Sequence, residues 1–356
     1  MQRMKLYETR LQADLNAIRE RVGSLADGVR AAVDEAVQGL VTRNNRRMYR
    51  VILDDGPYNR ETRSIDRACH SFVARHVPAA GHLRFVSSVL RLTIGLERIG
   101  DYAVTICRVG VHLEGALPPQ IIDDIKTLSD QANRMLELSI RAFLKGDADL
   151  ARETKKMARA VDNTHDRIFA DILAGETGHH VADVARLLTV YDKLERVSDQ
   201  AKNICEEAVF VTTGETKAPK TYRVLFVDND GAFMAPLAAG LAGRAFPESG
   251  NYRCASLRPA VAHDAQLATL SDLLSLSVPV DAAAKLEALA PNLAKYHVVV
   301  ALNLEAVELP PIPFHTVLQL WAVDDCRDDE GAKGVVNDLS DLIRNLMETL
   351  RGPDAS

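Results

Sequence analysis

One stretch that occurs twice constrains this chain more than any other feature. The twelve residues LERIGDYAVTIC at 96–107 return as LERVSDQAKNIC at 194–205, aligned without a gap and identical at seven positions. A match of this quality exceeds what composition alone produces, so we interpret it as an internal repeat. Each copy lies late in an apolar run with helical periodicity. The chain is therefore expected to contain two equivalent helices, one in each repeat.

Each copy carries a Glu and an Asp four residues apart, namely Glu97 with Asp101 and Glu195 with Asp199. Residues at i and i+4 share one face of a helix, one turn apart. We call each such pair an acidic ladder. Two ladders on equivalent helices of a repeat can meet across the interface between the repeats, which is the geometry that a cation site needs. A lone pair of this kind is usually a solvated helix face. Because the pair occurs twice, we give cation binding and a solvated helix face equal weight.

Apolar periodicity divides the first part of the chain into two sets of three helices. Leu11, Leu15 and Ile18 begin the first series, and Gly56-Pro57 should kink or restart the second helix. The repeated motif lies on the third helix of each set. We therefore predict an all-α domain of tandem three-helix bundles. Its expected bounds are residues 1–216, with the first repeat at 5–113 and the second at 118–213; the helices cover 6–43, 47–76, a segment ending near 113, 119–144, 147–174 and 180–212.

The pattern changes after a polar linker at 217–221. A β-rich run at 222–227 stops at Asp228, further β runs lie at 297–302 and 316–323, and an amphipathic helix covers 335–350. Strands that alternate with helices are typical of a parallel sheet. Residues 222–352 should therefore form an α/β domain of a different class from the first.

Charge and cysteine usage exclude several classes of protein. The formal net charge is −6, with no domain-wide basic excess, so nucleic acid is not expected as a partner. The five cysteines are scattered singly, which is typical of reduced thiols in the cytoplasm. No apolar run is long enough for a bilayer and the N-terminus has no apolar leader segment. We expect a cytoplasmic protein without direct membrane insertion; a homodimer is left open.

Two segments carry a resemblance to the PhoU family of phosphate-uptake regulators. They are HLRFVSSVLRLTIGLERIGDYAVTIC at 82–107 and VILDDGPYNRETRSIDRACHSFVARHVPAAGHLRF at 51–85, and the paired LER-x-x-D copies are that family's hallmark. The resemblance implies a pseudo-symmetric pair of three-helix bundles and a non-enzymatic role. It also implies metal clusters bound through E-x-x-x-D motifs. The implied partners are the phosphate ABC transporter and a membrane sensor kinase.

The same resemblance implies a ligand set for a divalent or ferric metal ion. The family's preceding helix carries a D-x-x-x-D pair, but here one acid of each pair is replaced, by Asn59 in the first bundle and Ala158 in the second. Thr105 and His82 also stand where the family usually has Asn and Asp. Fewer hard oxygen ligands are therefore present than in the family's clusters. The implied ligands are Glu97, Asp101, Glu195, Asp199, Asp55 and Asp162, with Asn203 in support.

The segment VLFVDNDGAFMAPLAAGL at 224–241 resembles the opening of the low-molecular-weight protein tyrosine phosphatase and arsenate reductase family. In that family a Cys thiolate attacks phosphorus while an Arg and the loop N–H groups hold the anion. Here the Cys position is Asp228, the Arg position is Met234 and the Ser position is Ala235. A carboxylate repels a phosphate dianion and a thioether cannot bind one. The resemblance thus implies a phosphatase fold without its usual chemistry.

The segment LWAVDDCRDD resembles the family's general-acid loop, with Asp325 at the acid position and Asp324 and Cys326 in place of the flanking prolines. Cys254 and Cys326 have no thiolate at position 228 to resolve, so they are expected to be structural. We predict a pseudo-enzyme domain. An alternative is a metal-dependent or atypical phosphatase that uses Asp228 as its nucleophile, although the loop 228–236 has no basic residue. A second alternative is a metal-free structural scaffold.

Overall fold

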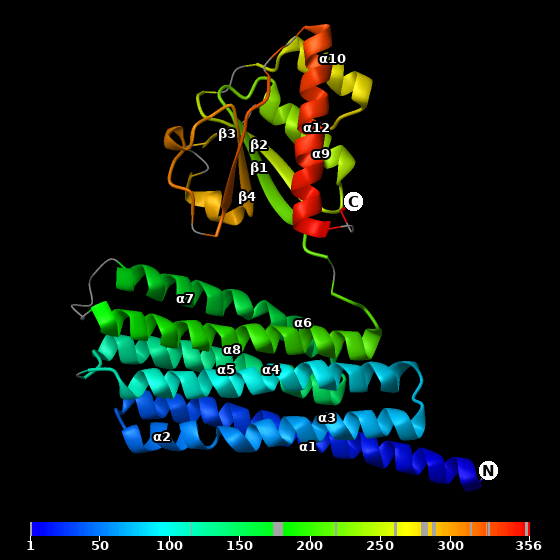
Figure 1. Ribbon diagram of the computed structural model, residues 1–356, viewed down its shortest axis with the longest axis vertical. Helices are drawn as coiled ribbons and strands as arrows, with labels where there is room; N and C mark the ends of the chain where they lie inside the picture. The colour runs from blue at the N-terminus through cyan, green and yellow to red at the C-terminus, as the bar shows by residue number, and fades with distance from the viewer. Residues whose placement is uncertain are drawn as a thin grey trace. The chain divides into compact units, whose positions relative to one another are not determined.

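The computed structural model divides into two compact units, Met1–Lys217 and Ala218–Ser356 (Figure 1). This division falls at the start of the expected linker. None of the described helices combines the length and apolarity that crossing a bilayer requires. The structure describes residues 2–114, 116–173, 181–217, 219–259, 262–278, 284–286, 290–313, 315–324, 326, 328–352 and 355–356.

The first unit is helical, as predicted. Its second and fifth predicted helices are each broken in two, at Asp54 and at Met157. The first break places Pro57 in the first turn of the following helix, where a missing N–H costs nothing because that N–H has no partner in the helix. No Gly or Pro signals the second break. The helices are α1 Gln2–Val41, α2 Asn45–Leu53, α3 Asp55–His76, α4 Ala80–Val111, α5 Pro119–Lys145, α6 Ala148–Lys156, α7 Ala158–Leu173 and α8 Val181–Thr213.

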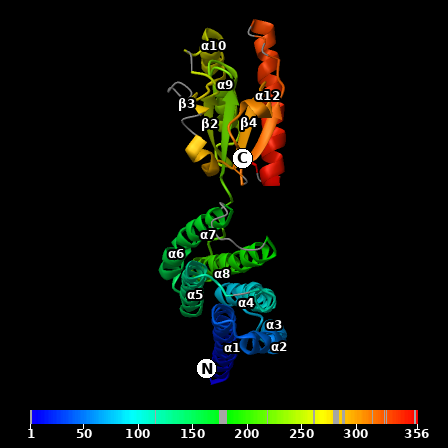
Figure 2. The same cartoon turned by 90° about the vertical axis from the view of Figure 1, so that its left-hand side faces the viewer.

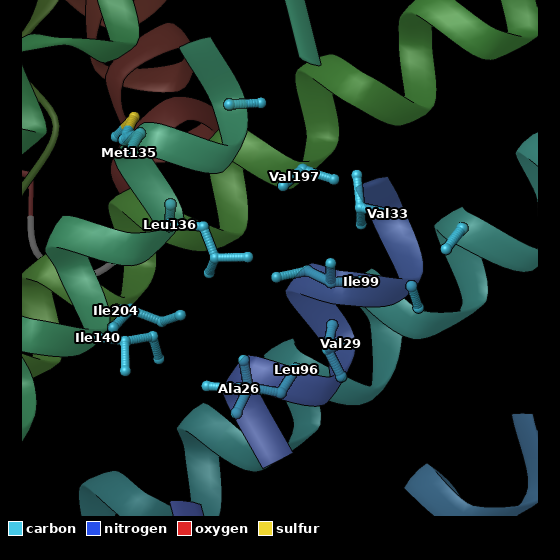
Figure 3. Packing of buried hydrophobic residues seen from close by; sticks show 14 of the residues in the cluster. Ala26, Val29, Val33, Leu96, Ile99, Met135, Leu136, Ile140, Val197 and Ile204 are labelled. Atoms are coloured by element: carbon cyan, nitrogen blue, oxygen red, sulfur yellow. The ribbon is translucent and has the colours of Figure 1, made fainter. Parts of the chain in front are cut away.

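The two bundles share one core. Seen nearly along the helix axes, α4 and α8 lie next to each other at the centre, with α1–α3 on one side and α5–α7 on the other (Figure 2). Val29 of α1 and Ile99 of α4 are fully buried in the same cluster as Leu136 of α5 and Val197 of α8 (Figure 3). Because this apolar surface is continuous, the repeats are expected to fold as one body.

The second unit is a five-stranded sheet, and all of its strand pairs are parallel, as the sequence predicts. The strand order is β3-β2-β1-β4-β5. The strands are β1 Tyr222–Asp228, β2 Gly250–Ser256, β3 Ala284–Lys285, β4 Val298–Leu302 and β5 Val317–Trp321. β2 was not predicted, because its first half is polar and partly exposed and gives no apolar run. β1 has neighbours on both sides, so the order reverses beside it and its carboxyl end lies at the switch point of the sheet.

Helices cover one face of this sheet and form its larger core. They are α9 Met234–Ala245, α10 Ala265–Leu274 and α12 Asp329–Arg351, the last of which begins six residues earlier than predicted (Figure 1). The other face carries a smaller cluster around Leu225, Val227 and Val299, near the short 3₁₀ helices η1 Ala290–Lys295 and η2 Ala306–Glu308. The sheet thus holds the end of β1 between its two cores.

Candidate functional site

The seven identities of the repeat divide into two kinds in the structure. Leu96, Ala103, Ile106 and Cys107 are buried, as are their counterparts in α8, so packing explains these four. The remaining three are the Glu, Arg and Asp of each copy, which keep contact with solvent. Core packing does not require identical polar residues there. The acidic ladders are therefore the candidate functional site of the helical unit.

The first ladder faces α3 of its own bundle. Burial is the first cause that raises the pKa of Asp101, and the carboxylate of Asp55 on α3 is the second. The Asn59 side-chain nitrogen Nδ2 donates a hydrogen bond of 3.1 Å to Asp55 Oδ2. Asn59 Oδ1 is buried and accepts no hydrogen bond in the described part of the chain. Asp55, Asn59 and Asp101 thus form a small oxygen-rich cluster on one side of the first bundle.

The second ladder faces α7 in the same way. Burial, followed by the carboxylates of Asp199 and Asp162, raises the pKa of Glu195 to about 7, while His165 opposes the change. Burial also raises the pKa of Asp162, against the pull of Lys202. His165 Nε2 lies 3.3 Å from Asp192 Oδ1. This cluster contains an imidazole and an ammonium group in addition to its carboxylates.

The two ladders do not meet across the repeat interface in this structure. α4 meets α8 at Gly95, where an added Cβ would lie 3.1 Å from Gln200 Oε1. Residues two apart on a helix are separated by about 200° around its axis, so Glu97 points away from α8. The charges that act on each ladder come from its own bundle. There are therefore two separate acidic clusters, one in each bundle.

A groove between α4 and α8 contains the remaining predicted ligand. Asn203 lines it together with Arg91, Arg98 and Glu207. Arg91 of the first repeat donates two hydrogen bonds to Glu207 of the second, at 2.6 and 2.7 Å. Periodicity could not reveal this pair, because its members stand 116 residues apart in the sequence. Asn203 thus lies in the joint between the repeats, where no carboxylate of either ladder is among the lining residues.

The carboxylates have the chemistry that hard cations prefer. Nevertheless, no three His, Cys, Asp or Glu side chains converge on a point that could hold a metal ion within the described ranges. The buried, unpaired Asn59 Oδ1 fits an oxygen-liganded cation, whereas Lys202 beside the second cluster does not. In this arrangement the residues do not form a complete metal centre, and metal binding stays a prediction.

In the second unit, Asp228 ends β1 at the switch point and only 3% of it is exposed. Its Oδ1 accepts a hydrogen bond from the Gly231 N–H at 2.6 Å, and its Oδ2 accepts one from the Ala235 N–H at 2.9 Å. Ala235 lies in the first turn of α9. The carboxylate therefore accepts hydrogen bonds from backbone N–H groups of the kind that could otherwise bind an anion. Asp228 serves as an internal cap for this loop.

Three more of the residues around this loop lie in the described part of the chain, namely Cys254, Cys326 and Met234. Burial first, and Asp228 second, raise the pKa of the Cys254 thiol to about 11. Cys326 is exposed, with its Sγ 3.4 Å from Asp328 Oδ2, and both cysteines are free thiols. Met234 Sδ lies 3.9 Å from Asn303 Nδ2. The predicted general acid, Asp325, lies outside the described residues.

Comparison with known proteins identifies relatives of the helical unit. The family model of the PhoU domain matches residues 22–109 and 125–208. A phosphate-specific transport system accessory protein PhoU homolog from Pseudomonas aeruginosa is 28% identical over 206 residues, which cover 57% of this chain and 85% of that protein. A Synechocystis protein of the same description is 31% identical over 154 residues, covering 43% of this chain and 69% of that protein.

Solved structures also match parts of this chain. The crystal structure of PhoU from Pseudomonas aeruginosa superposes with a TM-score of 0.55 and 28% identity, covering 57% of this chain and 99% of that one. An arsenate reductase from Archaeoglobus fulgidus gives a TM-score of 0.31 and 17% identity, covering 35% of this chain and 98% of that one.

Proposed function

The chain belongs to the PhoU family, and on that premise we propose that it is a non-catalytic, cytoplasmic regulator of phosphate uptake and of phosphate-starvation signalling. Its relatives are described as accessory proteins of the phosphate-specific transport system. The partners would be the phosphate ABC transporter and its sensor kinase. The observation that carries this proposal is the pair of bundles with equivalent polar identities outside the core.

The test of this function is complementation in a bacterium that lacks its own PhoU. The full chain is expressed in that strain, and phosphate uptake and a phosphate-starvation reporter are measured in rich phosphate. We expect expression to lower both toward the levels of the parent strain. If the folded chain is present and neither quantity changes, the proposal fails.

Metal binding at the two clusters is the finer part of the proposal. A cation held by Asp55, Asp101 and Glu97, or by Asp162, Asp199 and Glu195, would offset the repulsion that Asp55 exerts on Asp101 and that Asp199 and Asp162 exert on Glu195. Elemental analysis of protein purified without chelator or affinity nickel tests this. We expect metal in the wild type and none in the Asp101→Asn/Asp199→Asn variant. Equal metal content in both proteins would exclude these clusters.

The second unit is proposed to be an accessory module without phosphatase activity. The support is the position of Asp228, whose two oxygens are both engaged by backbone N–H groups and which is almost fully buried. An attacking carboxylate needs a free oxygen and a nearby cation. A phosphatase assay of the full chain with Mg²⁺ should give no turnover. Turnover that Asp228→Asn removes would establish the enzymatic alternative.

A further inference from the structure

The segment 43–75 has a charge balance opposite to that of the whole chain. It contains eight arginines against four carboxylates, in a chain whose formal net charge is −6. The inward-directed arginines are paired: Arg47 lies 2.8 Å from Glu35, and Arg43 donates to main-chain carbonyls of the α4 end. Arg75 lies 3.2 Å from Asp14, and the other five arginines are exposed. The acidic ladders do not explain this excess of basic residues in one segment.

Five arginines of this segment are exposed and, within the described residues, make no ion pair or side-chain hydrogen bond. Arg46 and Arg50 of α2 are four residues apart, and Arg60, Arg63 and Arg67 of α3 are three and four residues apart, so the arginines of each helix share one face. Exposed Tyr49 and Leu53 lie on the same face of α2, with 54% and 80% of their surface accessible. We call this surface the arginine face. It comprises Arg46, Tyr49, Arg50, Leu53, Arg60, Arg63 and Arg67.

The arginine face points outward from the helical unit. α2 and α3 both pack against α1 and α4, so the opposite side of both helices is free of these neighbours (Figure 2). From Arg46 to Arg67 the arginine face extends up to about 30 Å at 1.5 Å per residue. Of the carboxylates between these two residues, Glu61 lies 2.8 Å from Arg21 and Asp66 lies 3.5 Å from His70 Nδ1. Asp54 lines a pocket together with Arg50, Tyr58 and residues of α1. An anionic surface could therefore meet exposed guanidinium groups of both helices.

We propose that the arginine face binds the surface of a membrane that contains anionic lipids. Guanidinium groups bind phosphate oxygens with two parallel hydrogen bonds, and basic residues near an anionic leaflet each strengthen adsorption. Leu53 and Tyr49 favour a lipid surface over a nucleic acid, because the boundary of the acyl chains accepts apolar side chains beside the phosphates. The negative charge on the rest of the chain would hold every other face away. This proposal concerns adsorption without insertion, and it does not depend on the proposed function.

The test is co-sedimentation of the full chain with vesicles. Phosphatidylglycerol mixed with phosphatidylcholine is the anionic probe, and pure phosphatidylcholine is the neutral reference. We expect binding to the anionic vesicles only. It should weaken strongly between about 0.1 M and about 1 M salt, where the screening length falls from about 10 Å to about 3 Å. No binding to anionic vesicles at the lower salt concentration would overturn the proposal.

Matched triple variants locate the binding surface. Arg60→Ser/Arg63→Ser/Arg67→Ser should lower vesicle affinity about 100-fold, since each arginine contributes about five-fold. The control, Lys126→Ser/Arg141→Ser/Arg159→Ser, removes three exposed charges from the second bundle and should not lower it. Circular dichroism checks that both proteins are folded. Equal affinity of the two variants would contradict the assignment to this face.

A second pair of measurements separates lipid from other anionic partners. Tyr49→Ser/Leu53→Ser should weaken vesicle binding about 10-fold, because apolar side chains leave the lipid boundary. A DNA duplex and polyglutamate are then tested as competitors at the same salt concentration. If either binds the chain more tightly than the vesicles do, the face belongs to nucleic acid or to an acidic protein, and the lipid proposal is wrong.

Discussion

Carboxylates stand at the key positions of both units, yet their surroundings differ. In the helical unit, Asp101 and Glu195 lie beside further carboxylates, and both have raised pKa values. In the α/β unit, Asp228 accepts hydrogen bonds on both oxygens and stabilises a loop. Ionisation of Asp101 and Glu195 is therefore disfavoured in the folded state, whereas the Asp228 carboxylate is held by two backbone N–H groups. Residue type alone does not separate a site from a structural element; the partners of the side chain do.

The largest expected effect comes from removing the Asp228 carboxylate. Asp228→Ala leaves two buried N–H groups without acceptors, so the second unit should lose about 2–4 kcal/mol. Trp321 is the chain's single tryptophan and lies in this unit, so its fluorescence during denaturation reports the change. Asp228→Asn retains one acceptor oxygen and should cost less. An unchanged denaturation midpoint in Asp228→Ala would show that the cap is unimportant.

Glu195 should change the free energy of unfolding by a smaller amount than Asp228. Its ionised form should lower stability, whereas the Asp228 carboxylate raises it. The pKa of Glu195 rises from 4.5 to about 7 on folding, so the folded state binds more protons than the unfolded state between these values. Stability should therefore fall by about 1–3 kcal/mol as pH rises through this window. Glu195→Gln should remove the dependence, which thermal unfolding at several pH values measures. A stability that rises with pH through this window in both proteins would contradict this cause.

The joint between the repeats should contribute less. Arg91→Ala removes the paired hydrogen bonds to Glu207, but about half of the arginine side chain is exposed. The loss should be about 0.5–1 kcal/mol and should shrink in high salt. Far-UV circular dichroism during denaturation measures it. If the loss of stability did not depend on salt, its cause would be the packing of the aliphatic part of Arg91 and not the ion pair.

The smallest effect is expected at the first ladder. Asp101→Asn removes a charge whose pKa is raised by burial and by Asp55, so stability should stay the same or rise by a few tenths of a kcal/mol. The same denaturation experiment decides this. A loss above about 1 kcal/mol would mean that the Asp101 carboxylate stabilises the fold. The contrast drawn between the ladders and Asp228 would then be wrong.

The sequence predicted the elements that carry strong periodicity. Gly56-Pro57 predicted a break that the structure places at Asp54, and the motif helices and the strand ending at Asp228 lie where expected. The direction of the ladders was not predictable, because it depends on Gly95 facing α8. The break at Met157 and strand β2 carry no local signal. The Arg91–Glu207 pair depends on tertiary contact alone.

The most direct test of the comparison is phosphate uptake in the PhoU-deficient strain that carries matched variants. Wild type, Glu97→Gln/Asp101→Asn/Glu195→Gln/Asp199→Asn and Asp228→Asn are expressed to the same level, and folding is checked for each. We predict that the ladder variant fails to lower uptake, while Asp228→Asn behaves as the wild type wherever it is folded. The account would be contradicted if the ladder variant lowered phosphate uptake as the wild type does, while the folded Asp228→Asn variant did not.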